Sequence, residues 1–262
     1  MFDDHLSSRH ADRSYNKKKI TVAIAGRVIM IKTLHPIYLN NLIEDKTFPL
    51  ENGDRLSREE FERRYQGENY KAELIEGIVH MAAALRFRSH GQPHGQMMMW
   101  LMNYVTETEG TLAGDAPSVR LDQDNEPQPD LVLMIDPDCG GQTKLTPDDY
   151  IEGAPELLAE ISASTVSIDL GDKKTAYQRN GVQEYLVWRV LEQQIDWFYL
   201  KEGQYLELLA DEDGITRSTI FPGLWLDRQA LINGNIKQVT TVLKLGIESK
   251  EHNDFVIKLA SI

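Results

Sequence analysis

The sequence predicts a mixed α/β (α+β) fold, in which helices flank both faces of a mixed central sheet. Two apolar runs lack polar alternation, in "PDLVLMID" (129–136) and "PELLAEISAS" (155–164), and such runs are typical of strands that are covered on both faces. Segments with helical character at 56–66, 94–108 and 167–182 lie between groups of strands. This order departs from a regular βαβ alternation, so we expect a mixed rather than a parallel sheet.

The N-terminal part of this fold begins with a helix at 56–66, where Ser57 and Glu60 form a capping box. Residues 70–84 then indicate two strands that join at the turn-type pair Glu76-Gly77. The helix at 94–108 places four apolar side chains on one face, namely those of Met97, Leu101, Tyr104 and Val105. Strands are expected next at 111–115, 118–122 and 129–136.

The C-terminal half continues with the second central strand and then the helix at 167–182. Ser167 or Asp169 is expected near its N-terminal cap, and Gly181 marks its end. The remaining expected elements are a strand at 184–190, a hairpin at 195–209 that turns at Glu202-Gly203, and a short helix at 227–233.

A chain of 262 residues, 41% of them hydrophobic, is long enough for one large domain. We expect a poorly ordered or loosely attached arm at 1–50, a domain at 51–235 and a helical C-terminal appendage at 236–262. The apolar run at 20–31 is interrupted by Arg27 and is too short to span a bilayer. A soluble, cytoplasmic protein without a membrane partner is therefore expected.

The net charge of −13 argues against a phosphate binder that works by attraction of the whole molecule. A local basic groove stays open, and the segment 84–96 is its main candidate. Its basic side chains are those of Arg86, Arg88, His90 and His94. The single cysteine, Cys139, excludes an internal disulfide and a cysteine-based zinc site, so any metal must bind to oxygen or imidazole.

Two acids lie in the two expected central strands, Asp130 and Glu160. An ionised carboxylate that leaves water costs several kcal/mol unless a cation or several donors compensate it. A shared magnesium ion would do so, with the backbone carbonyl of Ile161 as a further oxygen ligand. Lys173, in the first turns of the next helix, could then orient an attacking water, lower its pKa or stabilise developing charge on phosphorus.

Other interpretations of these residues remain open at this point. Asp130 could cap a loop, Glu160 could pair with an Arg or Lys, and Lys173 could be exposed to solvent. Pairs of acids on strands are also typical of glycosidases, although that chemistry gives Lys173 no task. The spacing of the residues therefore does not identify the reaction.

Six segments in order resemble the Uma-two family of restriction-endonuclease-like proteins, within the PD-(D/E)XK nuclease superfamily. They are "AELIEG" (72–77), a helix beginning near His94, "PQPDLVL" (127–133), "GAPELLAEISAST" (153–165), "DLGDKKTAY" (169–177) and "NGVQEYLVW" (180–188). The resemblance covers roughly residues 55 to 230. It implies an αβββαβ core and hydrolysis of phosphodiester bonds with Mg or Mn as cofactor and nucleic acid, DNA foremost, as substrate.

The same resemblance implies roles for individual residues. Asp130 is similar to the motif aspartate and Glu160 to the motif glutamate, whereas Ser162 stands where the superfamily normally has its lysine. The Uma-two pattern moves that lysine to the following helix, which selects Lys173 over Lys174.

Three further residues match the family and are expected to support the site. Glu73 and His94 could complete the metal shell or contact phosphate, and Tyr177 could pack against the stem of Lys173. Ala163 departs from the Ser-Pro of the family pattern, and the segment is one residue shorter.

The leading hypothesis is a metal-dependent endonuclease. The alternative is a nuclease-fold protein that binds nucleic acid or a protein partner without cleavage, which the acidic composition and the altered strand end favour. Because nucleases that cut both strands usually dimerise, a homodimer is expected.

Overall fold

The computed structural model describes residues 21–24, 27–30, 48–65, 70–82 and 84–262. The chain divides into two units, residues 1–48 and 49–262. In the first unit, β1 (Thr21–Ile24) and β2 (Arg27–Met30) form an antiparallel pair. The rest of the expected arm at 1–50 lies outside the described residues, apart from residues 48–50.

The second unit is built on a six-stranded mixed sheet with the strand order β13-β12-β11-β10-β7-β5. Its strands are β5 (Thr111–Asp115), β7 (Leu131–Ile135), β10 (Leu157–Ser162), β11 (Glu184–Arg189), β12 (Gln194–Lys201) and β13 (Gln204–Glu207). Only β10 and β11 pair in parallel, and the other neighbours are antiparallel. The two runs without alternation are β7 and β10, adjacent in the interior of the sheet, which confirms the mixed sheet and its two central strands.

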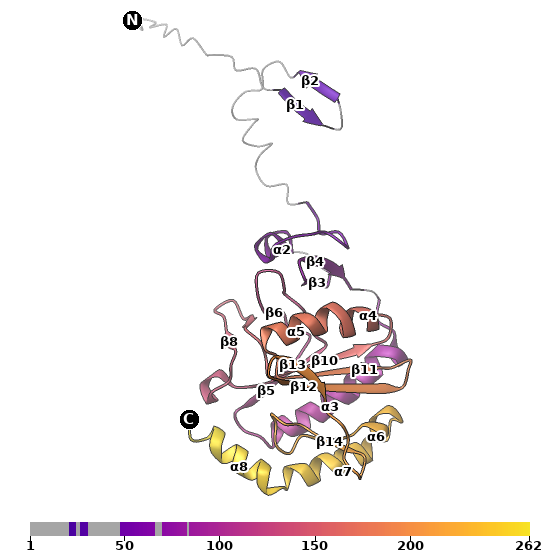
Figure 1. Cartoon of the computed structure of the whole chain (residues 1–262), viewed down its shortest axis with the longest axis vertical. Coiled ribbons are helices and arrows are strands. Elements are labelled where there is room, and N and C mark those ends of the chain that lie inside the picture. The colour runs from indigo at the N-terminus through magenta and orange to yellow at the C-terminus, as the bar shows by residue number, and fades with distance from the viewer. Residues whose placement is uncertain (1–20, 25–26, 31–47, 66–69, 83) are drawn as a thin grey trace, which may run out of the picture. The chain divides into compact units, whose positions relative to one another are not determined.

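Helices cover both faces of this sheet (Figure 1). Side chains at alternate positions of β10, such as Leu157 and Ile161, pack in one cluster with Met97, whereas Leu158 packs on the other face with Tyr177. The helices of the first face are α3 (Gln92–Thr106), α6 (Arg228–Ile232), α7 (Ile236–Ile247) and α8 (Lys250–Leu259), and those of the second are α4 (Val166–Ile168) and α5 (Lys174–Asn180). The order α3, β5, β7, β10, α5, β11 is the expected αβββαβ core.

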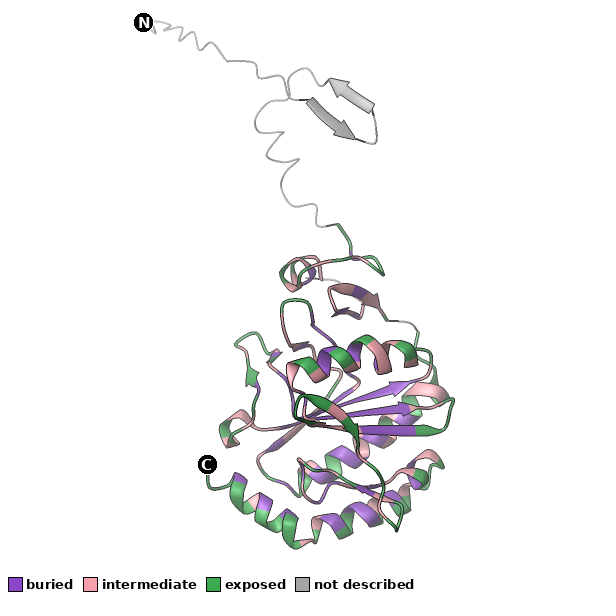
Figure 2. Cartoon of the chain, viewed as in Figure 1, coloured by how far each residue is buried: buried purple, intermediate pink, exposed green. Residues whose placement is uncertain are grey.

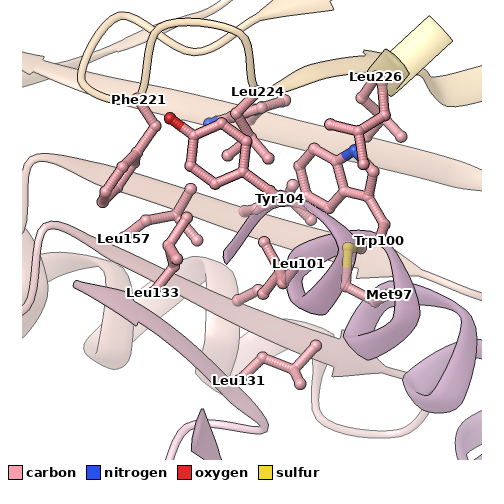
Figure 3. Close-up of a cluster of buried hydrophobic side chains, with 14 of the residues drawn as sticks. Met97, Trp100, Leu101, Tyr104, Leu131, Leu133, Leu157, Phe221, Leu224 and Leu226 are labelled. Atoms are coloured by element: carbon pink, nitrogen blue, oxygen red, sulfur yellow. The ribbon is translucent and has the colours of Figure 1, made fainter. Parts of the chain in front are cut away.

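The largest core cluster lies between α3 and the sheet, where Figure 3 shows Trp100 and Tyr104 above Leu133 and Leu157. Trp100 meets Trp197 edge to face at 5.7 Å, and its Nε1 donates to the carbonyl of Trp225 at 3.0 Å. Buried residues alternate with exposed ones along α7 and α8 (Figure 2). The segment expected as a helical appendage thus contributes to the main core, through Val239, Leu243, Phe255 and Leu259.

The expected strand at 118–122 does not join the central sheet. Only β6 (Val119–Arg120) forms, and it pairs with β9 (Ile151–Glu152), which also pairs with β8 (Lys144–Leu145). The cause is local, because Ala116 has a positive φ of 49° and Pro117 has no N–H to continue a ladder after β5. This unit also contains the 3-10 turn η2 (Pro137–Cys139) and the paired strands β14 (Ile215–Arg217) and β15 (Trp225–Asp227).

Ahead of the core lie α2 (Arg58–Tyr65) and the hairpin of β3 (Ala72–Ile75) and β4 (Ile78–Met81), all close to their predicted positions. Glu76 and Gly77 form the turn with φ values of 51° and 71°, as a tight hairpin requires. No helix in the described part of the chain has the length and apolar character that crossing a bilayer needs.

The β3–β4 hairpin is attached to the core through Glu126. The backbone N–H and carbonyl of Glu126 bond with those of Leu74 at 2.8 and 3.1 Å. Its carboxylate is buried, 4.0 Å from the guanidinium of Arg120. Burial raises the pKa of Glu126 from 4.5 to about 8, and the neighbouring carboxyl of Glu62 adds to the shift.

This raised pKa predicts that stability falls as the pH rises. Between pH 4.5 and 8 the folded protein holds a proton on Glu126 that the unfolded chain has released. The free energy of unfolding should therefore fall across this window, by up to about 1.4 kcal/mol per pH unit for one group. In urea unfolding at several pH values, Glu126→Gln should reduce the slope and the exposed control Glu152→Gln should keep it. Equal slopes in both variants would contradict the assignment.

Candidate active site

A cleft of about 790 Å³ collects most of the residues that the sequence singled out. It is lined by Glu73 of β3, Asp130 before β7, Glu160 and Ile161 of β10, and Lys173 just before α5. These residues are far apart in the sequence and meet because β7 and β10 are adjacent strands. His94 and Tyr177 stand behind this lining and contact it through Asp130 and Glu160.

Glu160 faces α5 because Leu157, Ala159 and Ile161 use the other face of β10. Its Oε1 accepts hydrogen bonds from Lys173 Nζ at 3.0 Å and from the hydroxyl of Tyr177 at 3.1 Å. Its Oε2 lies 3.4 Å from the backbone N–H of Asp130. The buried acid is thus compensated by a cation and by two neutral donors.

Lys173 reaches Glu160 because the helix before it widens. The π-helical turn η3 (Asp169–Lys173) lies between α4 and α5, and both of its end residues are buried. Lys173 Nζ lies 2.9 Å from Glu73 Oε1 and 3.9 Å from Asp169 Oδ1. Lys174 faces elsewhere, with its ammonium 3.6 Å from the ring centre of Phe198.

The side chain of Lys173 is only 5% exposed, so the alternative of a solvent-exposed lysine is wrong. Burial alone would lower the pKa of Lys173, but the carboxylates of Glu160, Glu73 and Asp169 raise it well above its usual value. Burial raises the pKa of Glu160, and Lys173 opposes that rise. The ammonium is therefore held in its charged form among three acids.

Asp130 links the two central strands at the cleft. Its Oδ2 accepts the backbone N–H of Ile161 at 2.8 Å. Its Oδ1 has looser neighbours, with His90 Nε2 at 3.5 Å and Lys71 Nζ at 4.0 Å. One carboxylate oxygen of Asp130 is therefore held by the sheet, and the other is open to the cleft.

His90 is a site residue that sequence reasoning left in the basic segment 84–96 without a role. It lies in a second π-helical turn, η1 (Phe87–Gly91), and its Nδ1 lies 3.1 Å from the carbonyl of Ile161. Its ring stacks on that of His94 at 5.7 Å. The i,i+4 spacing of the two histidines was the signal that could have found it.

His94 itself contacts backbone and a different acid. Its Nε2 lies 3.1 Å from the carbonyl of Asp130 and 3.2 Å from Asp115 Oδ1. Asp169 also differs from expectation, because the residue at the N-cap of α4 is Thr165. Asp169 instead accepts from the Thr165 hydroxyl at 2.6 Å and faces Lys173.

Within the described residues, no group of three or more His, Cys, Asp or Glu side chains is arranged to hold a metal ion. Magnesium needs fewer protein ligands than three, since it typically binds one or two carboxylates and keeps several waters. Asp130 Oδ1 and Glu160 Oε2 each lack a short hydrogen bond to any residue that the structure describes. The carbonyl of Ile161, expected as a third ligand, already contacts His90.

Charge in the cleft also fits a divalent cation. Four carboxylates, those of Glu73, Asp130, Glu160 and Asp169, line it together with three cationic groups, those of Lys71, Arg86 and Lys173. Acidic side chains therefore outnumber cationic ones by one, four against three, in the lining of the cleft. Carboxylate oxygens are the donors that magnesium and manganese prefer, so the side chains of the cleft are chemically compatible with such an ion.

A family model described as "Putative restriction endonuclease", that of the Uma-two family, matches residues 58–229. The chain belongs to this family. The matched region begins with α2 and ends in α6, so every element that lines the cleft belongs to it. No protein in the curated collection of sequences matches the chain.

A crystal structure from Anabaena variabilis, described as a "putative nuclease belonging to DUF820", is similar in fold. The superposition has a TM-score of 0.50 at 14% sequence identity, and it covers 72% of this chain and 99% of the other. Both comparisons agree with the nuclease-like core that the sequence predicted.

Proposed function

We propose that the protein is a metal-dependent endonuclease that hydrolyses phosphodiester bonds of DNA. Asp130 and Glu160 would hold Mg²⁺ or Mn²⁺. When bound, the metal would stabilise negative charge on the phosphate and favour deprotonation of an attacking water. The observation that carries this proposal is that Lys173 donates to both Glu160 and Glu73 in a cleft that Asp130 also lines.

Lys173 would act as a charged hydrogen-bond donor. A lysine ammonium has three N–H groups, and Glu73 and Glu160 accept from it at 2.9 and 3.0 Å. Asp169, at 3.9 Å, lies beyond hydrogen-bond distance, which leaves one N–H for a water or a phosphate oxygen. Because its pKa is raised, the lysine would keep its proton and would not serve as the base.

Tyr177 would hold the carboxylate of Glu160, the acid that binds Lys173, in its orientation. Its hydroxyl donates to the same Glu160 oxygen that receives Lys173, and burial raises the pKa of this phenol well above its usual value. It therefore remains a neutral donor that orients Glu160. His90 would hold the strand end in the same way, through the carbonyl of Ile161.

The test is a cleavage assay with Asp130→Asn and Glu160→Gln. Each variant should bind Mn²⁺ more weakly in calorimetry and should cut single-stranded, duplex or branched DNA at least about 100-fold more slowly, as expected when a main electrostatic contribution is lost. Glu152→Gln, an exposed acid outside the cleft, is the matched control and should cut like the wild type.

Wild-type protein that binds nucleic acid but cuts no substrate with Mg²⁺ or Mn²⁺, and takes up neither metal, would contradict the proposal. In that case the family core would serve binding alone. A binder of this kind should also keep its affinity for nucleic acid when both carboxylates are replaced.

A further inference from the structure

Apolar and basic side chains combine in the segment 84–88, which follows β4 and continues into η1, and its first three residues line the cleft. All five of these residues are exposed, and Phe87 and Leu85 are 74% and 70% exposed. Leu85 and Arg86 line the cleft, and so does Leu191, which is 71% exposed and lies between β11 and β12. The rim of the cleft therefore presents large apolar groups to solvent.

The two arginines of this segment are neighbours of Phe87 in the sequence. Arg86 and Arg88 flank Phe87 in the chain, and neither forms an ion pair with any residue that the structure describes. Elsewhere in the described chain, exposed basic groups such as Arg179 and Lys250 do pair with acids. In a protein with a net charge of −13, this stretch is a local basic surface.

The reacting groups lie deep relative to this rim. The side chains of Glu160 and Lys173 are each 5% exposed. A phosphodiester must therefore enter the cleft to reach them, past Leu85 and Leu191. A stacked duplex keeps its base faces covered and offers nothing to an exposed aromatic ring, whereas an unpaired strand offers both base faces and a flexible backbone.

We propose that the cleft accepts an unpaired stretch of nucleic acid, with Phe87 stacked on a base and Arg86 and Arg88 on the flanking phosphates. Aromatic rings interleaved with cations are how proteins bind single strands without reading their sequence. Leu85 and Leu191, which line the cleft, would contact the same strand. The inference rests on the proposed function for the identity of the cleft, but the binding it predicts is measurable without cleavage.

The experiment measures fluorescence anisotropy of a fluorescein-labelled single-stranded oligonucleotide and of the blunt duplex of the same sequence. Full-length protein is used in EDTA, so that no cleavage takes place. Wild-type protein should bind the single strand at least ten times more tightly than the duplex. DNA and RNA oligonucleotides are compared as separate arms, because both offer bases and phosphates of this kind.

Variants then assign the contacts. Phe87→Ala should weaken binding of the single strand by about 5- to 100-fold, the usual effect of losing one stacked base, and Phe87→Trp should restore it. Arg86→Ala and Arg88→Ala should each lower the salt dependence of binding by about 0.7 in the slope of log K against log salt. Leu191→Ala should weaken binding, while Leu245→Ala, an exposed leucine of α7, should not.

Equal or tighter binding of the duplex, or no binding of either oligonucleotide, would overturn the inference. So would wild-type affinity in Phe87→Ala, or a change of oligomeric state in that variant by light scattering, since the rim would then contact a second copy. Selective binding of the single strand without cleavage would overturn the proposed function only. Cleavage of duplex and single strand at equal rates, unaffected by Phe87→Ala, would overturn the inference only.

Discussion

Lys173→Met should slow DNA cleavage by about 10²- to 10⁴-fold, the range typical of losing a positioned proton donor or a charge-stabilising group. The substitution removes the ammonium that contacts Glu73 and Glu160 while it keeps most of the volume of the stem. It also leaves the buried carboxylates without their cation. We therefore expect the free energy of unfolding to fall by about 3–5 kcal/mol, the usual cost of breaking a buried pair.

Lys174→Met is the matched control, because it removes the adjacent lysine from the ring of Phe198 and leaves the cleft intact. It should cut DNA like the wild type. Cleavage is measured per folded molecule, with the folded fraction determined by circular dichroism at the assay temperature. A folded Lys173→Met protein with wild-type cleavage would remove this lysine from the mechanism.

Trp100→Ala should lower the free energy of unfolding by about 3–5 kcal/mol, because the indole is fully buried and the sheet cannot collapse to fill its space. The ring packs edge to face on Trp197 and donates to the carbonyl of Trp225, so the variant also loses this hydrogen bond. Urea unfolding at neutral pH measures the change.

Met102→Ala, on the same helix but 42% exposed, is the control and should change the free energy of unfolding by less than about 1 kcal/mol. Similar losses in both variants would show that the loss does not depend on the burial of the substituted side chain, since alanine itself favours a helix. A loss confined to Trp100→Ala would show that packing between α3 and the sheet holds this layer in place.

The elements that the sequence could predict are those whose pattern is local. Leu131 to Ile135 carry no alternation and form a strand in the sheet interior, and Glu76-Gly77 and Glu202-Gly203 adopt the positive φ values that tight turns need. The prediction that residues 118–122 form a strand of the central sheet was wrong, because the chain turns at Ala116 and then pairs in a small separate sheet.

The candidate site was predictable only in part. Asp130 and Glu160 stood out as acids within apolar strands, and the family resemblance selected Lys173. Asp169 and His90 were missed as site residues because both lie in π-helical turns, where a periodicity of 3.6 residues assigns the wrong face. Lys71 was missed because its proximity to Asp130 depends on how the β3–β4 hairpin is attached through Glu126.

Because of the π-helical turn η3, the number of residues between β10 and α5 decides which side chain of the helix faces Glu160. A π-turn accommodates one residue more than an α-helical turn would over the same path, and here that extra residue brings Lys173 to Glu160 and turns Lys174 toward Phe198. Loss of one residue, such as the unobstructed Gly171, would rotate the register by about 100° without altering any side chain of the cleft. Relatives that differ in length at this turn would therefore have to supply the cation from another position of the helix.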